Sequence, residues 1–84
     1  MTQTAEMIAA IDESTRHNIT VEITVPDVQA AYLDLLASEY DIDSEDRTGS
    51  DDRHGDRRVL RVWGWTGETP DGEADWTLTL VQAA

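Results

Sequence analysis

Arginine, histidine and tryptophan gather in one short stretch of this chain, and these side chains are its clearest candidates for chemistry. Five of the six arginines lie between residues 47 and 61, with His54 among them and with Trp63 and Trp65 directly after. Guanidinium groups bind phosphate oxygens and indole rings stack on bases, so the stretch has the residue types of a site for an anion or single-stranded nucleic acid. The residues that would form this site are Arg53, Arg57, Arg58 and Arg61.

The charge of the whole chain argues against such a site. The 84 residues include 18 Asp and Glu but only six Arg and no Lys, which gives a formal net charge of -12. A surface of this charge repels polyanions, and the counterion release that drives nucleic-acid binding weakens steeply as salt rises. We therefore expect the arginines to pair with carboxylates of the chain or of a second copy. The anion site is kept as the alternative.

The carboxylates suggest a metal site, but their pattern is incomplete. Asp41, Asp43 and Glu45 alternate as the first ligands of a calcium loop do. The sixth position, which requires glycine, is Asp46, and the twelfth, which requires glutamate, is Asp52. The chain also lacks Cys, so a thiolate site is excluded. We expect no specific metal and no cofactor, only monovalent cations held loosely among the carboxylates.

Hydroxyl and imidazole groups are present without a catalytic context. Nucleophilic catalysis would have to use Ser14, Ser38, Ser44 or Ser50 with His17 or His54, and none of these serines lies in a nucleophile-elbow sequence. Glycine-rich phosphate-binding and dinucleotide motifs are also absent from the sequence. We expect no enzymatic activity. His17 and Asn18 are expected to close a helix, with Asn18 in the left-handed conformation.

The acidic composition indicates concentrated salt more clearly than any activity. Carboxylates hold water and cations, arginine replaces lysine throughout, Phe is absent and aromatic residues make up 6%. In these respects the chain resembles the small acidic proteins of haloarchaea, which accumulate molar KCl in the cytoplasm. The resemblance is one of composition and carries over no functional residue. No apolar run approaches the ~18 residues of a membrane span and no signal peptide is visible, so we expect a halophilic, cytoplasmic protein without membrane contact.

The elements that position these residues follow from periodicity. Residues 4–16 predict a helix, residues 19–25 alternate as a half-buried strand, and Pro26-Asp27 opens a second helix whose apolar spacing continues to Tyr40. Residues 58–65 and 74–81 predict two more strands, joined through a Pro-Asp-Gly turn as a hairpin. The predicted order is therefore α-β-α-β-β, which is typical of an α+β domain.

The predicted topology is a single domain, 1–84, with one three-stranded sheet and both helices on one of its faces. Placing the third strand in the middle gives the spatial order 2-3-1 and makes every neighbouring pair antiparallel, with a right-handed crossover. Trp76 would then lie nearer the rim of the core than Leu78 and Leu80. Residues 43–57, acidic and rich in arginine, predict a long loop that buries almost nothing.

The orientation of the second predicted strand, residues 58–65, determines which side chains lie on the sheet face away from the helices. If Leu60 and Val62 face the helices, the open sheet face carries Val59, Arg61, Trp63, Trp65 and Val81. The opposite register would bury both indoles and direct Arg61 into the core unpaired, so we favour the first. Two indoles on an open face mark an interaction site. We therefore expect a protein-interaction module, a homodimer or a partner of another protein, with anion or single-stranded nucleic-acid binding as the alternative.

Overall fold

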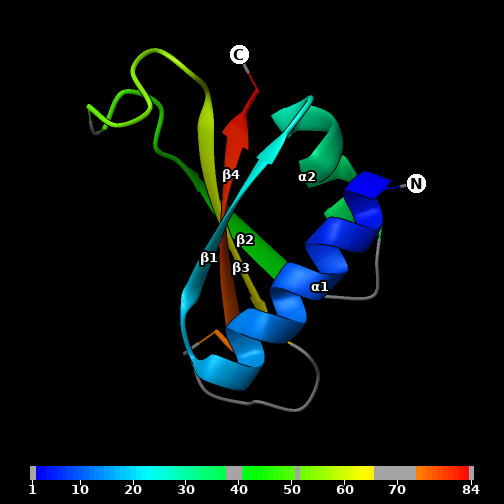
Figure 1. The fold of residues 1–84 in the computed structure, drawn as a ribbon. Helices are drawn as coiled ribbons and strands as arrows, with labels where there is room; N and C mark the ends of the chain where they lie inside the picture. Colours follow the sequence, from blue (N-terminus) through cyan, green and yellow to red (C-terminus); the bar gives the residue numbers. More distant parts are fainter. Residues whose placement is uncertain (1, 38–40, 51, 66–73, 84) are drawn as a thin grey trace.

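The computed structural model describes residues 2–37, 41–50, 52–65 and 74–83 (Figure 1). In chain order its elements are α1 (Thr2–His17), β1 (Thr20–Val25), α2 (Val28–Leu36), β2 (Asp41–Asp46), β3 (Val59–Trp65) and β4 (Trp76–Gln82). The strands form one mixed sheet in the order β1-β4-β3-β2, and both helices lie on one side of it (Figure 1). The α+β class and the two-layer arrangement predicted from the sequence are confirmed.

The sheet contains one strand more than predicted. Residues 41–46, expected at the start of the long loop, pair antiparallel with β3 in the register Asp41↔Trp65 to Asp46↔Leu60. This additional strand reverses the direction of everything after it, so that β4 runs parallel to β1. The prediction of a three-stranded, fully antiparallel sheet was therefore wrong, although β4 does lie between β1 and β3 as expected.

The sequence of β2 does not predict a strand, because it is almost wholly polar. Ile42 alone packs against the core, and the other residues of the strand are acidic or Ser44. Aspartate is a poor strand former, so backbone pairing with β3 and the burial of Ile42 hold the segment extended. A strand of carboxylates at the edge of the sheet also discourages pairing with another chain.

The core fills the space between the helices and the sheet. It comprises Met7, Ala10 and Ile11 of α1, Val25 of β1, Val28, Ala31 and Leu35 of α2, Leu60 and Val62 of β3, and Trp76, Leu78 and Leu80 of β4. Leu60 and Val62 therefore face the helices, and Arg61 between them is exposed. The register that the sequence favours for this strand is confirmed.

Trp76 is fully buried, which corrects the prediction that it lies nearer the rim. Its indole occupies the space above Gly64, its register partner on β3. A Cβ atom at position 64 would lie 2.7 Å from Cε2 of Trp76 and 2.9 Å from the carbonyl oxygen of Asp41. The glycine is therefore required by the close approach of the indole and of the neighbouring strand.

Each helix is fixed at its end by polar contacts. Asn18 closes α1 with φ 55°, the left-handed conformation expected for this residue. Asp27 caps α2, its carboxylate accepting from the backbone N–H groups of Gln29 (3.0 Å) and Ala30 (3.3 Å). From β4, Gln82 accepts from the N–H of Val28 at 2.9 Å. α2 ends at Leu36, with Ala37 as its C-cap, and so is shorter than the apolar spacing up to Tyr40 predicts. Tyr40 itself and the Pro-Asp-Gly turn lie outside the described residues.

Ser14 joins α1 to both the first and the last strand. Its buried hydroxyl donates to the carbonyl of Ile19 (2.5 Å) and accepts from the N–H of Thr77 (2.9 Å). Ile19 directly precedes β1, and Thr77 is the second residue of β4. The Ser14 hydroxyl, considered as a nucleophile in the sequence analysis, thus has a structural role.

We expect Ser14→Ala to lower the free energy of unfolding by about 1–3 kcal/mol, because a partly buried N–H and a carbonyl would lose their partner. Denaturant titration at constant KCl measures the loss. Thr15→Val is the matched control, since the Thr15 hydroxyl donates to the Ile11 carbonyl within its own helix (2.9 Å). A loss in Ser14→Ala no larger than in the control would contradict the assigned role.

Candidate interaction surface

The sheet face away from the helices holds the residues that the sequence singled out. Register places them in cross-strand rows over β1, β4, β3 and β2: one row is Glu22, Thr79, Arg61 and Glu45, and the next is Thr20, Thr77, Trp63 and Asp43. Trp65 lies opposite Asp41. Both indoles therefore stand beside carboxylates of β2, and Arg61 lies between a threonine and a glutamate.

One end of this face is covered by the loop of residues 47–58, of which residue 51 is not described. Val59 and Val81 pair on the open face, yet they are only 4% and 1% exposed. The loop is tied to β3 by bonds from Arg47 N–H to the Val59 carbonyl (2.8 Å) and from Val59 N–H to the Thr48 hydroxyl (3.1 Å). The loop itself is exposed, as the sequence predicts: of the described residues between 43 and 57, only Ser44 and His54 are partly buried.

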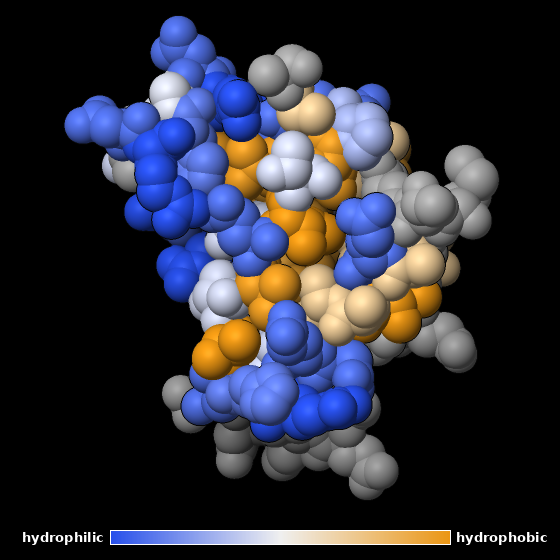
Figure 2. All heavy atoms as spheres, viewed as in Figure 1, coloured by the Kyte–Doolittle hydropathy of each residue, from blue (hydrophilic) through white to orange (hydrophobic). Residues whose placement is uncertain are grey.

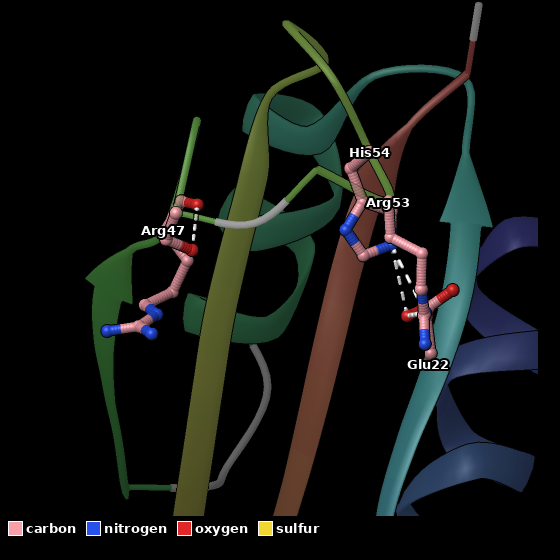
Figure 3. Close-up of polar contacts among 5 residues, drawn as sticks. Glu22, Arg47, Arg53 and His54 are labelled. Atoms are coloured by element: carbon pink, nitrogen blue, oxygen red, sulfur yellow. Dashed lines mark hydrogen bonds and ion pairs between the residues drawn. The ribbon is translucent and has the colours of Figure 1, made fainter.

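The far end of the loop reaches across β4 to the edge strand (Figure 3). Nε2 of His54 lies 3.1 Å from Oε1 of Glu22 on β1, and Arg53 pairs with the same oxygen. The His54 side chain is only 10% exposed. Since β4 separates β3 from β1, this contact holds the loop over the pair of valines, and the indoles lie toward the other end of the face, beyond the described part of the loop.

Trp63 and Trp65 lie on the open face as predicted, but both are half-buried rather than standing free in solvent. The most exposed large apolar side chains of the described residues lie elsewhere. Ile8, Ile19, Leu33 and Leu36 each keep about half of their surface accessible. The indole patch is consequently smaller than the sequence suggested, and α1 and α2 also present apolar surface.

The four arginines of the alternative anion site are directed to different parts of the protein. Arg53 pairs with Glu22 on β1, whereas Nη2 of Arg58 donates to Gln29 on α2 at 3.2 Å. Arg61 lies on the open face opposite Glu45, and Arg57 is exposed in the loop. Arg47 also pairs with Glu45, at 3.5 Å. Arg53 and Arg47 thus pair with carboxylates of the chain, as expected, whereas Arg58 contacts an amide.

At the junction of β2 and the loop, Asp46 is held in its ionised form. Hydrogen bonds from the Thr48 hydroxyl and from the Thr48 N–H, the latter at 2.8 Å, lower the pKa of this carboxyl below its ordinary value, and Arg58 adds a smaller effect of the same sign. The turn that starts the loop therefore has a charged acceptor at its base, which helps to direct the chain from β2 onto the open face.

The residues considered for metal binding and catalysis are separated in the structure. Asp41, Asp43 and Glu45 are spaced along one face of an extended strand instead of wrapping round one point. Across the described part of the chain, no three His, Asp or Glu side chains are grouped so as to hold a metal ion. Ser38 lies outside that part. Within it, too, no helix has the length and apolar character needed to cross a membrane.

A groove between α1 and β1 is a second surface, which the sequence did not reveal. It has a volume of about 470 Å³ and is lined by Glu6, Ala9, Ala10, Asp12, Glu13, Arg16, His17, Val21 and Ile23. Strict alternation predicts Val21 and Ile23 as core residues, but β1 is an edge strand and both are half-buried. The predicted order 2-3-1 already placed this strand at an edge, and the part that the sequence did not show is how incompletely α1 covers the two side chains.

Comparisons of this chain with protein-family models, with curated proteins and with solved structures found no match.

Proposed function

We propose that this chain is a small protein-interaction module that forms a homodimer through the indole end of its open sheet face. The composition supports a salt-rich cytoplasm as its setting. The observation that carries the proposal is the position of Trp63 and Trp65, which occupy successive same-face sites of β3 beyond the region that the 47–58 loop covers. Aromatic anchors of this kind dominate the energy of protein interfaces.

The charges beside the indoles suit a second copy of the chain. Arg61 shares the face with the carboxylates of Asp43 and Asp41. A twofold axis through the patch would allow the guanidinium of each copy to meet carboxylates of the other, because an isologous contact places each surface against itself. Each Å² of indole surface removed from water would add about 25 cal/mol, less the entropic cost of association.

The test is sedimentation in molar KCl of the parent chain and of Trp63→Thr/Trp65→Thr. We expect the parent to be a dimer and the variant a folded monomer, because threonine keeps strand propensity while removing the aromatic anchors. Circular dichroism verifies that the variant is folded. A monomeric parent would refute the proposal.

Leu33→Gln/Leu36→Gln is the matched control, since it removes two half-exposed apolar side chains from α2 instead. It should remain dimeric, and a monomeric control beside a dimeric indole variant would move the interface to the helices. Anion or single-stranded nucleic-acid binding remains the alternative function. It predicts that the parent retains a labelled oligonucleotide in molar KCl and that Arg57→Gln/Arg58→Gln releases it.

A further inference from the structure

The groove between α1 and β1 combines an apolar floor with an unoccupied strand edge. β1 lies at one edge of the sheet, and within the described residues β4 is the one strand that pairs with it. Val21 and Ile23 direct their side chains to the helix layer, where α1 covers them only in part. Figure 2 shows hydrophobic surface in the middle of the face where α1 and β1 meet, with hydrophilic residues to its left and below it.

The polar groups of this edge follow from the pairing with β4. The carbonyl of Val25 accepts from the N–H of Ala83 at 2.8 Å, so Val25 presents its backbone groups toward β4. Alternate residues of a strand present these groups to opposite sides. The backbone N–H and C=O groups of Thr20, Glu22 and Thr24 therefore face outward, as a template for one further strand.

The rim of the groove is acidic. Glu6, Asp12 and Glu13 of α1 line it together with Arg16, which forms a 2.6 Å ion pair with Asp12. Three carboxylates and one guanidinium leave a charge of -2 with His17 neutral. The rim thus favours a cationic occupant. A second copy of the chain would bring two acidic rims together, so it is disfavoured here.

We propose that this groove binds an extended segment of another protein, which adds to β1 as a fifth strand and carries basic side chains at alternate positions. Side chains on the groove side of such a strand would lay their aliphatic stems over Val21 and Ile23. Their charged ends would then reach Glu6 and Glu13, as long basic side chains do on apolar surfaces with an acidic margin. The site is separate from the indole face and does not depend on the homodimer.

The probe is a fluorescent peptide of alternating arginine and threonine, measured by anisotropy at a KCl concentration where the chain is folded. We expect saturable binding, with the largest amide chemical-shift changes in Thr20–Val25 and along α1. A peptide with glutamate in place of arginine should bind at least about tenfold more weakly, because each rim ion pair becomes a repulsion. Absence of binding, or shifts centred on Trp63 and Trp65, would overturn the proposal.

Peptide methylation tests the added strand without altering the protein. Methyl groups on the threonine amides block antiparallel addition to β1, whereas methyl groups on the arginine amides block parallel addition, because the two orientations direct opposite sets of N–H groups toward the edge. One methylated peptide should lose binding and the other keep it. Equal behaviour of the two would show that backbone pairing is not involved, and would overturn the proposal.

Protein variants test the acidic rim. Glu6→Lys/Glu13→Lys should weaken binding of the arginine peptide by about tenfold. Asp34→Lys/Asp56→Lys reverses the same number of charges at residues that do not line the groove, and should change binding by less than about threefold. Equal weakening of peptide binding in both variants would show that the effect depends on net charge alone, and would contradict a binding site at the acidic rim.

Discussion

Gly64→Ala is expected to lower the free energy of unfolding by about 3 kcal/mol, which is large for the addition of one methyl group. The new Cβ would lie 2.7 Å from Cε2 of Trp76 and 2.9 Å from the Asp41 carbonyl oxygen, far inside ordinary contact distance. The indole is fully buried and the carbonyl belongs to the backbone of β2, so neither can yield without disturbing the core or the β2–β3 pairing. Denaturant unfolding at constant KCl measures the loss.

A double-mutant cycle identifies the cause of that loss. Trp76→Leu removes the ring that the new methyl group would meet, so Gly64→Ala should cost less in the Trp76→Leu background than in the parent. A coupling of about 1 kcal/mol or more is expected for two residues in direct contact. If the two losses simply add, the steric explanation fails and the cost must arise from the conformation of the strand.

The melting temperature is expected to rise by at least about 10 °C as KCl increases from about 0.1 M to about 3 M. With 18 acidic residues and six arginines, at least 12 carboxylates have no guanidinium of their own. Over this range the Debye length falls from about 10 Å to below 3 Å, which removes most of their mutual repulsion in the folded state. Each kcal/mol so gained raises the melting temperature of a domain of this size by roughly 4–8 °C. A circular-dichroism melting series measures it.

A variant with fewer charges separates screening from other effects of salt. Glu6, Glu13, Asp34 and Asp56 are exposed, and changing them to their amides removes four negative charges without touching the core. The variant should melt higher than the parent at low salt and gain less from added KCl. A parent whose melting temperature stays constant or falls across the series would contradict the salt-adapted proposal itself.

Local patterns in the sequence predict those parts of the fold that local forces determine. The periodicity of α1, the alternation of β1 and the left-handed Asn18 depend on neighbouring residues, and each was predicted correctly. Arg61 also predicted which side of β3 faces the helices, because burying an unpaired guanidinium in the core would cost too much free energy. These features require no knowledge of what lies across the sheet.

The errors arose where distant residues decide the structure. β2 has one apolar residue, and its extended form depends on pairing with β3 and not on its own propensity. Missing it inverted the expected direction of β4. The contact between His54 and Glu22 joins positions 32 residues apart. Local sequence patterns therefore cannot predict that the loop covers Val59 and Val81. The edge position of β1 was predicted, but the groove beside it was missed, because the way α1 packs on the sheet decides how much of Val21 and Ile23 is covered.

The central position of β4 has a consequence for the order in which the chain can fold as it is made. Of the described strands β4 comes last along the chain, yet it separates β1 from β3 and supplies Trp76, Leu78 and Leu80 to the core. While the ribosome still holds this segment, β1 has no neighbour to pair with and α1 has little of its sheet to cover. Because pairing β1 with β4 also closes a loop of more than 50 residues, the native sheet forms only once β4 is available, as a single late step whose rate is limited by chain closure.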